Sequence, residues 1–318
     1  MKSSIPLVTV LIPVYNGEKF LAEAIDSVLN QTFSDFELLI VNDCSTDKSR
    51  NIINSYQDKR IRLINNEKNI GQNKSMNRGL KLAKGKYIAR LDQDDVSCKD
   101  RLQLQIKYIS GLSKTILGSW AYDINNNSET VGYIQNPLDN DSIIDSLAIS
   151  SSLTHSSIFM ERKDMLSLGG YSDKYNIAMD WALWIKAAKN NYKFMNIPKY
   201  LIGLRKHSMQ VTKSNRGKKD LNKEILRLIS STKSFIQTNN NFNAYMGWKY
   251  YHELIYILYN NHPLICFYKL VLHLLKFKLV YELIRLSVYH KIIKNPMNYY
   301  NVPSYSTKKP VLYKYHLN

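Results

Sequence analysis

Two hydrophobic patterns alternate along the first hundred residues of the chain. Short β-branched and aliphatic runs predict buried strands, and four such runs cover residues 8–13, 36–41, 61–64 and 87–91. Between them, apolar residues recur at the spacing of a helix face, and the helices predicted in this way cover residues 20–29, 45–56 and 73–83. Asn16 is the expected cap of the first helix, and Ser45 and Thr46 are candidate caps of the second.

Strands that alternate with helices over short connections predict a parallel sheet with helices on both faces. In such sheets, ligands bind at the carboxyl ends of the strands. Polar side chains follow three of the predicted strands, namely Tyr15, Asp43, and the pair Asp92 and Asp94. We therefore expect these side chains to meet along one edge of the sheet, although they are far apart in the sequence.

The middle of the chain is less regular. Residues 125–128 are rich in Asn and predict a turn between two hairpin strands. Residues 179–190 have the apolar spacing of a helix, and residues 194–197 and 200–204 predict short strands on either side of Pro198.

Composition and charge divide the chain into two parts. The chain has 318 residues, of which 44% are hydrophobic and 22% are charged, and this composition suits a folded core rather than wholesale disorder. The net charge of +18 is distributed unevenly: residues 1–212 contain 27 Lys and Arg against 22 Asp and Glu, whereas residues 213–318 contain 17 against 4. We therefore predict a domain over 1–212, followed by a basic helical region over 213–318.

The basic region has two interpretations that stay open. Lysines lie beside aromatic residues there, as Lys249 does beside Trp248 and Tyr250, which is typical of a helix in the headgroups of an anionic membrane. The same composition fits a helical subdomain that packs on the first part and keeps its lysines in water. No nucleic-acid-binding motif accompanies the charge, so we expect no nucleic-acid partner.

The three cysteines, Cys44, Cys98 and Cys266, are far apart and odd in number. This pattern argues against a disulfide scaffold or a structural zinc site and fits a reducing compartment. No uncharged apolar run approaches the length of about 20 residues that a membrane-spanning helix needs. We expect a cytoplasmic protein, peripheral on the inner face of the cell membrane if the basic region binds lipid.

The predicted strand 87–91 is followed by three carboxylates within four residues: Asp92, Asp94 and Asp95. Like charges this close repel one another, and a divalent cation would compensate them. Carboxylate oxygens suit Mn²⁺ or Mg²⁺, with a diphosphate completing the coordination. The alternative is a solvated turn before a capped helix, but a surface turn does not need the buried strand that precedes this one.

The ends of the first two strands can serve a nucleotide. Asp43 can accept a hydrogen bond from a base N–H, and Tyr15 can stack beside the base or pack on the ribose; alternatively, Asp43 only caps a turn and Tyr15 is an ordinary packed aromatic. The sequence has neither G-x-G-x-x-G nor G-x-x-x-x-G-K-[ST]. A pyrophosphate would then depend on a metal ion and basic side chains.

Four segments resemble, in order and spacing, the inverting family 2 glycosyltransferases of GT-A fold, including those of bacterial polysaccharide and glycan assembly. The segments are Pro-Val-Tyr-Asn-Gly at 13–17, Val-Asn-Asp-Cys-Ser-Thr-Asp at 41–47, Asn-Ile-Gly at 69–71 with Asn-Arg-Gly at 77–79, and Leu-Asp-Gln-Asp-Asp at 91–95. The resemblance covers about residues 5–210. It implies an α/β, Rossmann-like fold: a mixed, mainly parallel sheet flanked by helices, with a C-terminal helical extension.

The resemblance also implies roles for individual residues. Nucleotide-sugar binding falls to Pro13, Tyr15, Glu18, Asp43, which contacts the base, Asp92, which faces the ribose and phosphates, and Gln93. Asp94 would hold the metal ion, His207 would reach the diphosphate or the metal, and Asp180 would be the catalytic base. Met76 stands where the family often has Arg, and Lys74 is the candidate replacement.

The chemistry implied is the transfer of a sugar from a nucleotide diphosphate-sugar, with UDP favoured, to an acceptor hydroxyl, with a glycan on a lipid carrier as the expected acceptor. Asp180 would take the proton of the attacking hydroxyl; alternatively, it is a first-turn acid favoured by the helix dipole, and His207 only caps a strand end. His155 is expected to be a buried structural histidine.

The rival functions are a nucleotidyltransferase and a non-catalytic subunit of a glycan assembly complex. The first usually has a Gly-rich basic loop after strand one, which is absent here, and the retained acids argue against the second.

Overall fold

The computed structural model describes residues 5–147, 151–208, 210, 220–221, 223–225 and 227–228. The chain divides into two units, Met1–Gln210 and Val211–Asn318, and the fold given below is that of the first. Apart from a few positions, the predicted basic helical region over 213–318 lies outside the described residues. No helix within the described ranges combines the length and the apolar character that crossing a bilayer requires.

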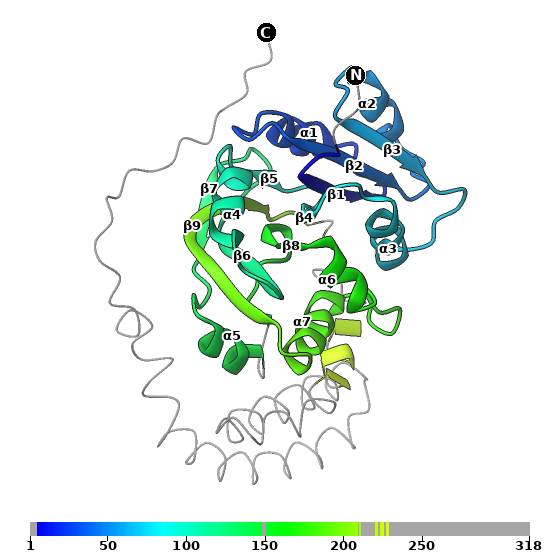
Figure 1. Ribbon diagram of the computed structural model, residues 1–318. Coiled ribbons are helices and arrows are strands. Elements are labelled where there is room, and N and C mark those ends of the chain that lie inside the picture. The colour runs from blue at the N-terminus through cyan, green and yellow to red at the C-terminus, as the bar shows by residue number, and fades with distance from the viewer. Residues whose placement is uncertain are drawn as a thin grey trace, which may run out of the picture. The chain divides into compact units, whose positions relative to one another are not determined.

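Within the described ranges, nine strands form one sheet in the order β3-β2-β1-β4-β8-β6-β9-β5, with β7 paired to β6 (Figure 1). The first half consists of four parallel strands that the hydrophobic runs predict: β1 (Val8–Val14), β2 (Phe36–Asn42), β3 (Ile61–Asn65) and β4 (Tyr87–Arg90). The short strand β8 (Phe159–Glu161) then runs antiparallel to both β4 and β6. The sheet is therefore mixed and mainly parallel in its first half, as predicted.

The second half of the sheet contains one long strand where two short ones were predicted. The turn at 125–128 does join two hairpin strands, β6 (Thr115–Ile124) and β7 (Thr130–Ile134). Instead of two strands around Pro198, however, β9 runs continuously over Lys193–Arg205 and pairs with β6, with a register irregularity. Proline has no N–H for the ladder, so it is tolerated where pairing is already irregular. The two-residue strand β5 (Val96–Ser97) pairs with the far end of β9.

Helices cover both faces of the parallel half. On one face, α1 (Leu21–Leu29) contributes Leu21 to a core cluster that also contains Val10 of β1. On the other face, α3 (Gln72–Leu82) packs against β1 and β2 (Figure 1). Successive strand residues point to opposite faces, so Leu11 points toward α3, where a Cβ added at Gly79 would lie 2.4 Å from its Cδ1. A glycine at that position therefore allows the helix to approach the sheet closely.

The remaining helices follow the sheet strands along the chain, and their bounds are α2 (Ser49–Ser55), α4 (Arg101–Ile109), α5 (Asn140–Leu147), α6 (Arg162–Ser167), α7 (Met179–Lys189) and a 3-10 turn at His155–Ser157. The predicted apolar side of α7 is buried. Trp184 is fully buried, and the indole N–H of Trp181 donates to the carbonyl of Leu147, 2.8 Å away. This contact fixes the start of α7, which carries Asp180.

The predicted helix caps are wrong, and the reason is informative. α1 begins after Phe20 without a side-chain cap, and Asn16 instead accepts a hydrogen bond at Oδ1 from the backbone N–H of Thr46, at 2.8 Å. α2 begins only at Ser49, and the backbone N–H before it, that of Lys48, donates to Glu18 Oε2 at 2.9 Å. Side chains in the loop after β1 thus accept hydrogen bonds from backbone N–H groups in the loop after β2, and these bonds hold the two strand ends together.

Candidate active site

The loops at the carboxyl ends of β1 and β4 are hydrogen-bonded to each other. The backbone N–H of Tyr15 donates to Gln93 Oε1 at 2.9 Å, and Gln93 Nε2 donates to the carbonyl of Tyr15 at 3.1 Å. From the start of α3, Gln72 Nε2 donates to Asp92 Oδ1 at 3.3 Å. The predicted meeting of the strand ends along one edge is therefore confirmed.

Asp43, at the end of β2, has a buried carboxylate with three donors. Asn66 Nδ2 lies at 2.7 Å, and the backbone N–H groups of Ile70 and Gly71 lie at 2.9 and 2.8 Å. Gly71 has a φ of 89°, a left-handed conformation in which glycine is unstrained. A carboxylate offers about four lone-pair positions, so Asp43 both folds the 69–71 turn around itself and keeps one position for a further donor.

Asp92, Asp94 and Asp95 form a compact acidic cluster after β4. One carboxylate oxygen of each lies within 4.8 Å of those of the other two. Burial, and then the charge of Asp92, raises the pKa of Asp94 to about 6. Burial, and then the charges of Asp94 and Asp92, also raises the pKa of Asp95. Both shifts mean that the surroundings do not fully compensate the negative charge, which is the condition that a divalent cation would relieve.

The three acids differ in what holds them. Asp92 makes a two-bond ion pair with Arg90. Asp95 accepts hydrogen bonds from the hydroxyl of Ser156 and from the backbone N–H of Arg205, the latter at 2.9 Å. The carboxylate of Asp94 has a different kind of partner, an imidazole that is itself a common metal ligand.

That partner is His207, whose Nε2 lies 2.8 Å from Asp94 Oδ2. The end of β9 places it there, because Arg205 Nε donates to the carbonyl of Asp94 at 2.8 Å and the ring of Phe20 packs on His207 with centroids 5.2 Å apart. The carboxylate of Asp94 and the imidazole of His207, side by side at a strand end, fit Mn²⁺ or Mg²⁺ coordinated also by a ligand's phosphates. The residues predicted to bind metal are thus adjacent.

Asp180 lies in the first turn of α7, where its Oδ2 accepts a hydrogen bond from the hydroxyl of Ser151 at 3.3 Å. Burial raises the pKa of Asp180, while the N–H of Trp181 and the positive charge of Arg90 act in the opposite direction. Asp180 therefore has the position of a helix first-turn acid and, in addition, the basicity and the cationic neighbour that a catalytic base would use.

Arg90 pairs with the acidic cluster and its charge lowers the pKa of Asp180, yet it was missed as a site residue from the sequence. Its side chain is 1% exposed at the end of β4. Besides pairing with Asp92, its Nη1 donates to the hydroxyl of Ser156 at 2.9 Å. A buried charge must be paired, so an arginine within an apolar strand and next to three acids was a readable signal. Ser156, in contrast, stands in a stretch that gives no such signal.

His155 is hydrogen-bonded, as expected, but it is half-buried rather than buried. Its Nε2 lies 2.8 Å from the hydroxyl of Tyr171. Burial and the nearby charge of Arg90 lower the pKa of His155 well below its usual range, so it is neutral.

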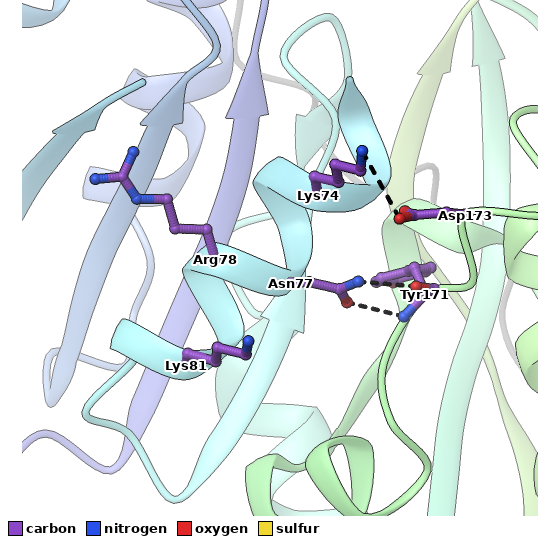
Figure 2. Close-up of a pocket in the computed structure, with 6 residues that line it drawn as sticks. All are labelled: Lys74, Asn77, Arg78, Lys81, Tyr171 and Asp173. Carbon is purple, nitrogen blue, oxygen red and sulfur yellow. Dashed lines mark hydrogen bonds and ion pairs between the residues drawn. The ribbon is translucent and has the colours of Figure 1, made fainter. Parts of the chain in front are cut away.

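Three further residues predicted for the nucleotide site are Pro13, Glu18 and Lys74. Pro13 is buried within β1, and the carboxylate of Glu18 is engaged with the start of α2. Lys74 points along α3 toward Asp173, with its Nζ 3.9 Å from Oδ2 (Figure 2). The α3 side chain that contacts Asp92 is Gln72, so a donor-binding role for Lys74 remains a prediction.

Comparisons with known proteins agree with this geometry. Residues 9–169 match the model of glycosyl transferase family 2. The chain is 36% identical over 205 residues to an uncharacterized glycosyltransferase of Methanocaldococcus jannaschii. This match covers 63% of this chain and 71% of that protein. It is 38% identical over 127 residues to WfgD of Escherichia coli, a UDP-Glc:alpha-D-GlcNAc-diphosphoundecaprenol beta-1,3-glucosyltransferase, covering 40% of this chain and 49% of WfgD.

A solved structure shows the same fold. It is the mannosyltransferase PcManGT from Pyrobaculum calidifontis in complex with GDP-Man and Mn²⁺, with a TM-score of 0.58 over 90% of this chain and 85% of that one. At 16% identity, this likeness supports the GT-A fold and nothing finer.

Proposed function

This chain belongs to glycosyl transferase family 2 and is a glycosyltransferase, and we propose that its activity depends on a metal ion. We further propose that it transfers a sugar from a nucleotide diphosphate-sugar to a hydroxyl of a lipid-linked glycan and inverts the anomeric centre. The observation that carries the proposal is the convergence of Asp94 and His207, together with the shared action of Arg90 on Asp92 and Asp180. The pair of Asp94 and His207 supports a site for the donor diphosphate, and the charge of Arg90 supports a base at Asp180 for the attacking hydroxyl.

On the donor side, the strand-end loops supply the nucleotide contacts. Asp43 has a lone-pair position left for a base N–H, and the ring of Tyr15, whose residue is 46% exposed, is free to stack. Pro13 and Glu18 flank the same loop. Asp94 and His207 would hold Mn²⁺ or Mg²⁺, which when bound supplies positive charge to the leaving nucleoside diphosphate.

On the acceptor side, one base is sufficient. Asp180 takes the proton from the acceptor hydroxyl as its oxygen attacks the anomeric carbon from the face opposite the leaving group. Burial raises the pKa of Asp180, which makes its carboxylate a stronger base, and the charge of Arg90 keeps it from remaining protonated. A single displacement inverts the anomeric centre without a covalent sugar–enzyme intermediate.

The substrates proposed are a UDP-sugar and an acceptor glycan on a diphosphate lipid, as part of cell-surface polysaccharide synthesis. By its name, WfgD uses both kinds of substrate, whereas PcManGT was solved with GDP-Man. The chain spans about half the length of WfgD, so the acceptor class is carried over only as a proposal. Work on a lipid-linked acceptor would place the protein peripherally at the inner face of the cell membrane, with the basic region over 213–318 facing the lipid.

The test uses the full chain with a panel of UDP-sugars and GDP-Man, with Mn²⁺, Mg²⁺ or EDTA. We expect release of nucleoside diphosphate that depends on the metal and rises with acceptor, and a product whose anomeric configuration, measured by NMR, is opposite to that of the donor. Activity in EDTA would exclude the metal, and a retained configuration would exclude inversion. Release of pyrophosphate would favour a nucleotidyltransferase, and no turnover with any donor would favour a non-catalytic subunit.

A further inference from the structure

A pocket of about 370 Å³ lies between α3 and the segment that joins α6 to α7 (Figure 2). Its lining residues are Lys74, Asn77, Arg78, Lys81, Tyr171 and Asp173. All six belong to the described first unit. None of them contacts the acidic cluster through any hydrogen bond or ion pair found among the described residues.

The wall of the pocket is preformed. Asn77 Nδ2 donates to the carbonyl of Tyr171 at 2.8 Å, and the backbone N–H of Tyr171 donates back to Asn77 Oδ1 at 2.9 Å (Figure 2). One turn earlier on α3, Asn73 Nδ2 donates to the carbonyls of Ser172 and Tyr175, at 2.8 and 2.6 Å. Both amides are committed to holding the segment, so a ligand would be recognised by the charged side chains around them.

Those charged side chains are two lysines on the same stripe of α3. Lys74 and Lys81 extend on the side of the helix that carries Asn77 (Figure 2), and a spacing of seven residues places them two turns, or about 10 Å, apart along the axis. Arg78 points the other way, where its Nη1 donates to the carbonyl of Asn65 at 3.1 Å.

The two lysines leave the pocket with a net positive charge. Lys74 pairs only loosely with Asp173, at 3.9 Å, and both side chains are more than half exposed, at 58% and 59%. The ammonium of Lys81 has no partner within the described part of the chain. Two exposed ammonium groups against one carboxylate favour a small, multiply charged anion such as a phosphate.

The pocket is joined to the predicted base through Tyr171 and the segment that follows it. The hydroxyl of Tyr171 contacts His155. Burial raises the pKa of Tyr171, the charge of Arg90 lowers it, and the charges of Asp180 and Asp92 raise it. The segment 171–178 leads from the pocket directly to α7, which carries Asp180.

We propose that this pocket binds the diphosphate of the acceptor's lipid carrier, with Lys74 and Lys81 holding the phosphates while the attached sugar presents its hydroxyl to Asp180. The inference rests on the proposed function, and it assigns Lys74 to the acceptor rather than to the donor. The donor's diphosphate has its own site at Asp94 and His207. An acceptor sugar bearing a diphosphate needs a second anion site, and the α3 pocket offers two lysines and is joined to α7 by the segment 171–178.

The experiment compares two acceptors that carry the same sugar: N-acetylglucosamine α-diphosphate on a short alkyl chain, and alkyl α-N-acetylglucosaminide without phosphate. The variants are Lys81→Gln, Lys74→Gln and, as a matched control, Lys107→Gln on the exposed surface of α4. We expect Lys81→Gln to raise KM for the diphosphate acceptor about fivefold, roughly 1 kcal/mol, and Lys74→Gln to do the same. For Lys81→Gln, kcat, the KM of the donor and the KM of the phosphate-free acceptor should stay unchanged, and Lys107→Gln should change nothing.

Calorimetric binding of the diphosphate acceptor needs no turnover, so it tests the pocket even if the transfer proposal fails. Unchanged affinity in Lys81→Gln, or an equal loss for both acceptors, would overturn the inference. So would a loss of binding to phosphatidylglycerol vesicles that contain no acceptor, because the lysines would then belong to a general membrane surface. If the wild-type protein transfers equally well to both acceptors, only this inference is contradicted. If it transfers to no sugar acceptor, the proposed function is contradicted.

Discussion

His207 Nε2 lies 2.8 Å from Asp94 Oδ2, although 113 positions separate the two residues in the chain. The end of β9 makes the contact possible, because Arg205 binds the carbonyl of Asp94 through Nε and binds Asp95 through its backbone N–H. The structure therefore fixes this pair before any cation is bound, so binding a metal ion would cost little side-chain conformational entropy.

Replacing Asp94 tests the metal site without disturbing the fold. We expect Asp94→Asn to reduce metal-dependent turnover about 100-fold or more, because roughly 2.7 kcal/mol of charge stabilisation is lost from the leaving group. The thermal unfolding midpoint should not fall, since the variant removes a charge from a crowded acidic cluster. Turnover titrated with Mn²⁺ measures the first effect, and calorimetry measures the second. Asp35→Asn, an exposed acid, is the control, and near-normal turnover in Asp94→Asn would contradict the assignment.

Metal affinity should depend on pH. Burial and Asp92 raise the pKa of Asp94 to about 6, and the protonated carboxyl cannot ligate a cation. Mn²⁺ affinity should therefore rise as the pH rises through about 6, with protons released on binding, and fall by up to about tenfold per unit below it.

Calorimetry in two buffers of different ionisation enthalpy counts those protons. His207→Gln is the control that keeps proton release from the acids. Binding that displaces no proton at pH 6 would contradict the prediction.

Asp180 should be dispensable for donor binding and required for transfer. Asp180→Asn keeps the size and polarity of the side chain but cannot accept a proton, so kcat should fall between about 10²- and 10⁴-fold. Donor affinity, measured by calorimetry with Mn²⁺, should stay within about twofold. Transfer at the normal rate by this variant would remove Asp180 from the role of base.

The alternation of patterns predicts the parallel half of the sheet well, because β1 to β4 and the intervening helices are long enough for periodicity to show. The two-residue β5 and three-residue β8 are too short to carry a pattern, and only their pairing with β9, β4 and β6 defines them. The cap predictions fail for a related reason: Asn16 has the residue type of a cap, but its partner is Thr46, thirty positions away.

The residues of the site likewise divide into those that the sequence can locate and those that it cannot. Strand-end acids such as Asp43 and Asp94 can be located from the sequence, because parallel strands bring their carboxyl ends together. Ser156 and Gln72, which hold Asp95 and Asp92, cannot be located in this way. Their residue types are ordinary on a surface, and their partners are contributed by other parts of the fold.

Arg90 gives the prediction that distinguishes an electrostatic role from a structural one. Its positive charge opposes the burial that raises the pKa of Asp180. Removing the charge raises that pKa further, and the base must be deprotonated to act. Arg90→Gln should therefore move the acid limb of the pH–rate profile to higher pH, whereas Arg90→Lys, which retains a charge, should move it less. Both variants should lose stability, by about 1–3 kcal/mol for Arg90→Gln, because the buried hydrogen bonds of Arg90 to Asp92 and Ser156 are lost.

A second buried arginine supplies the control for this prediction. Arg101 is fully buried and its Nη2 donates to the carbonyl of Arg90 at 2.7 Å, yet Asp180 is not among the charges that act on it. Arg101→Gln should thus destabilise the fold to a comparable degree and leave the acid limb in place. If both variants shift the limb equally, the effect comes from loosened packing around β4. If only Arg90→Gln shifts it, the charge of Arg90 is what keeps Asp180 ionised at neutral pH.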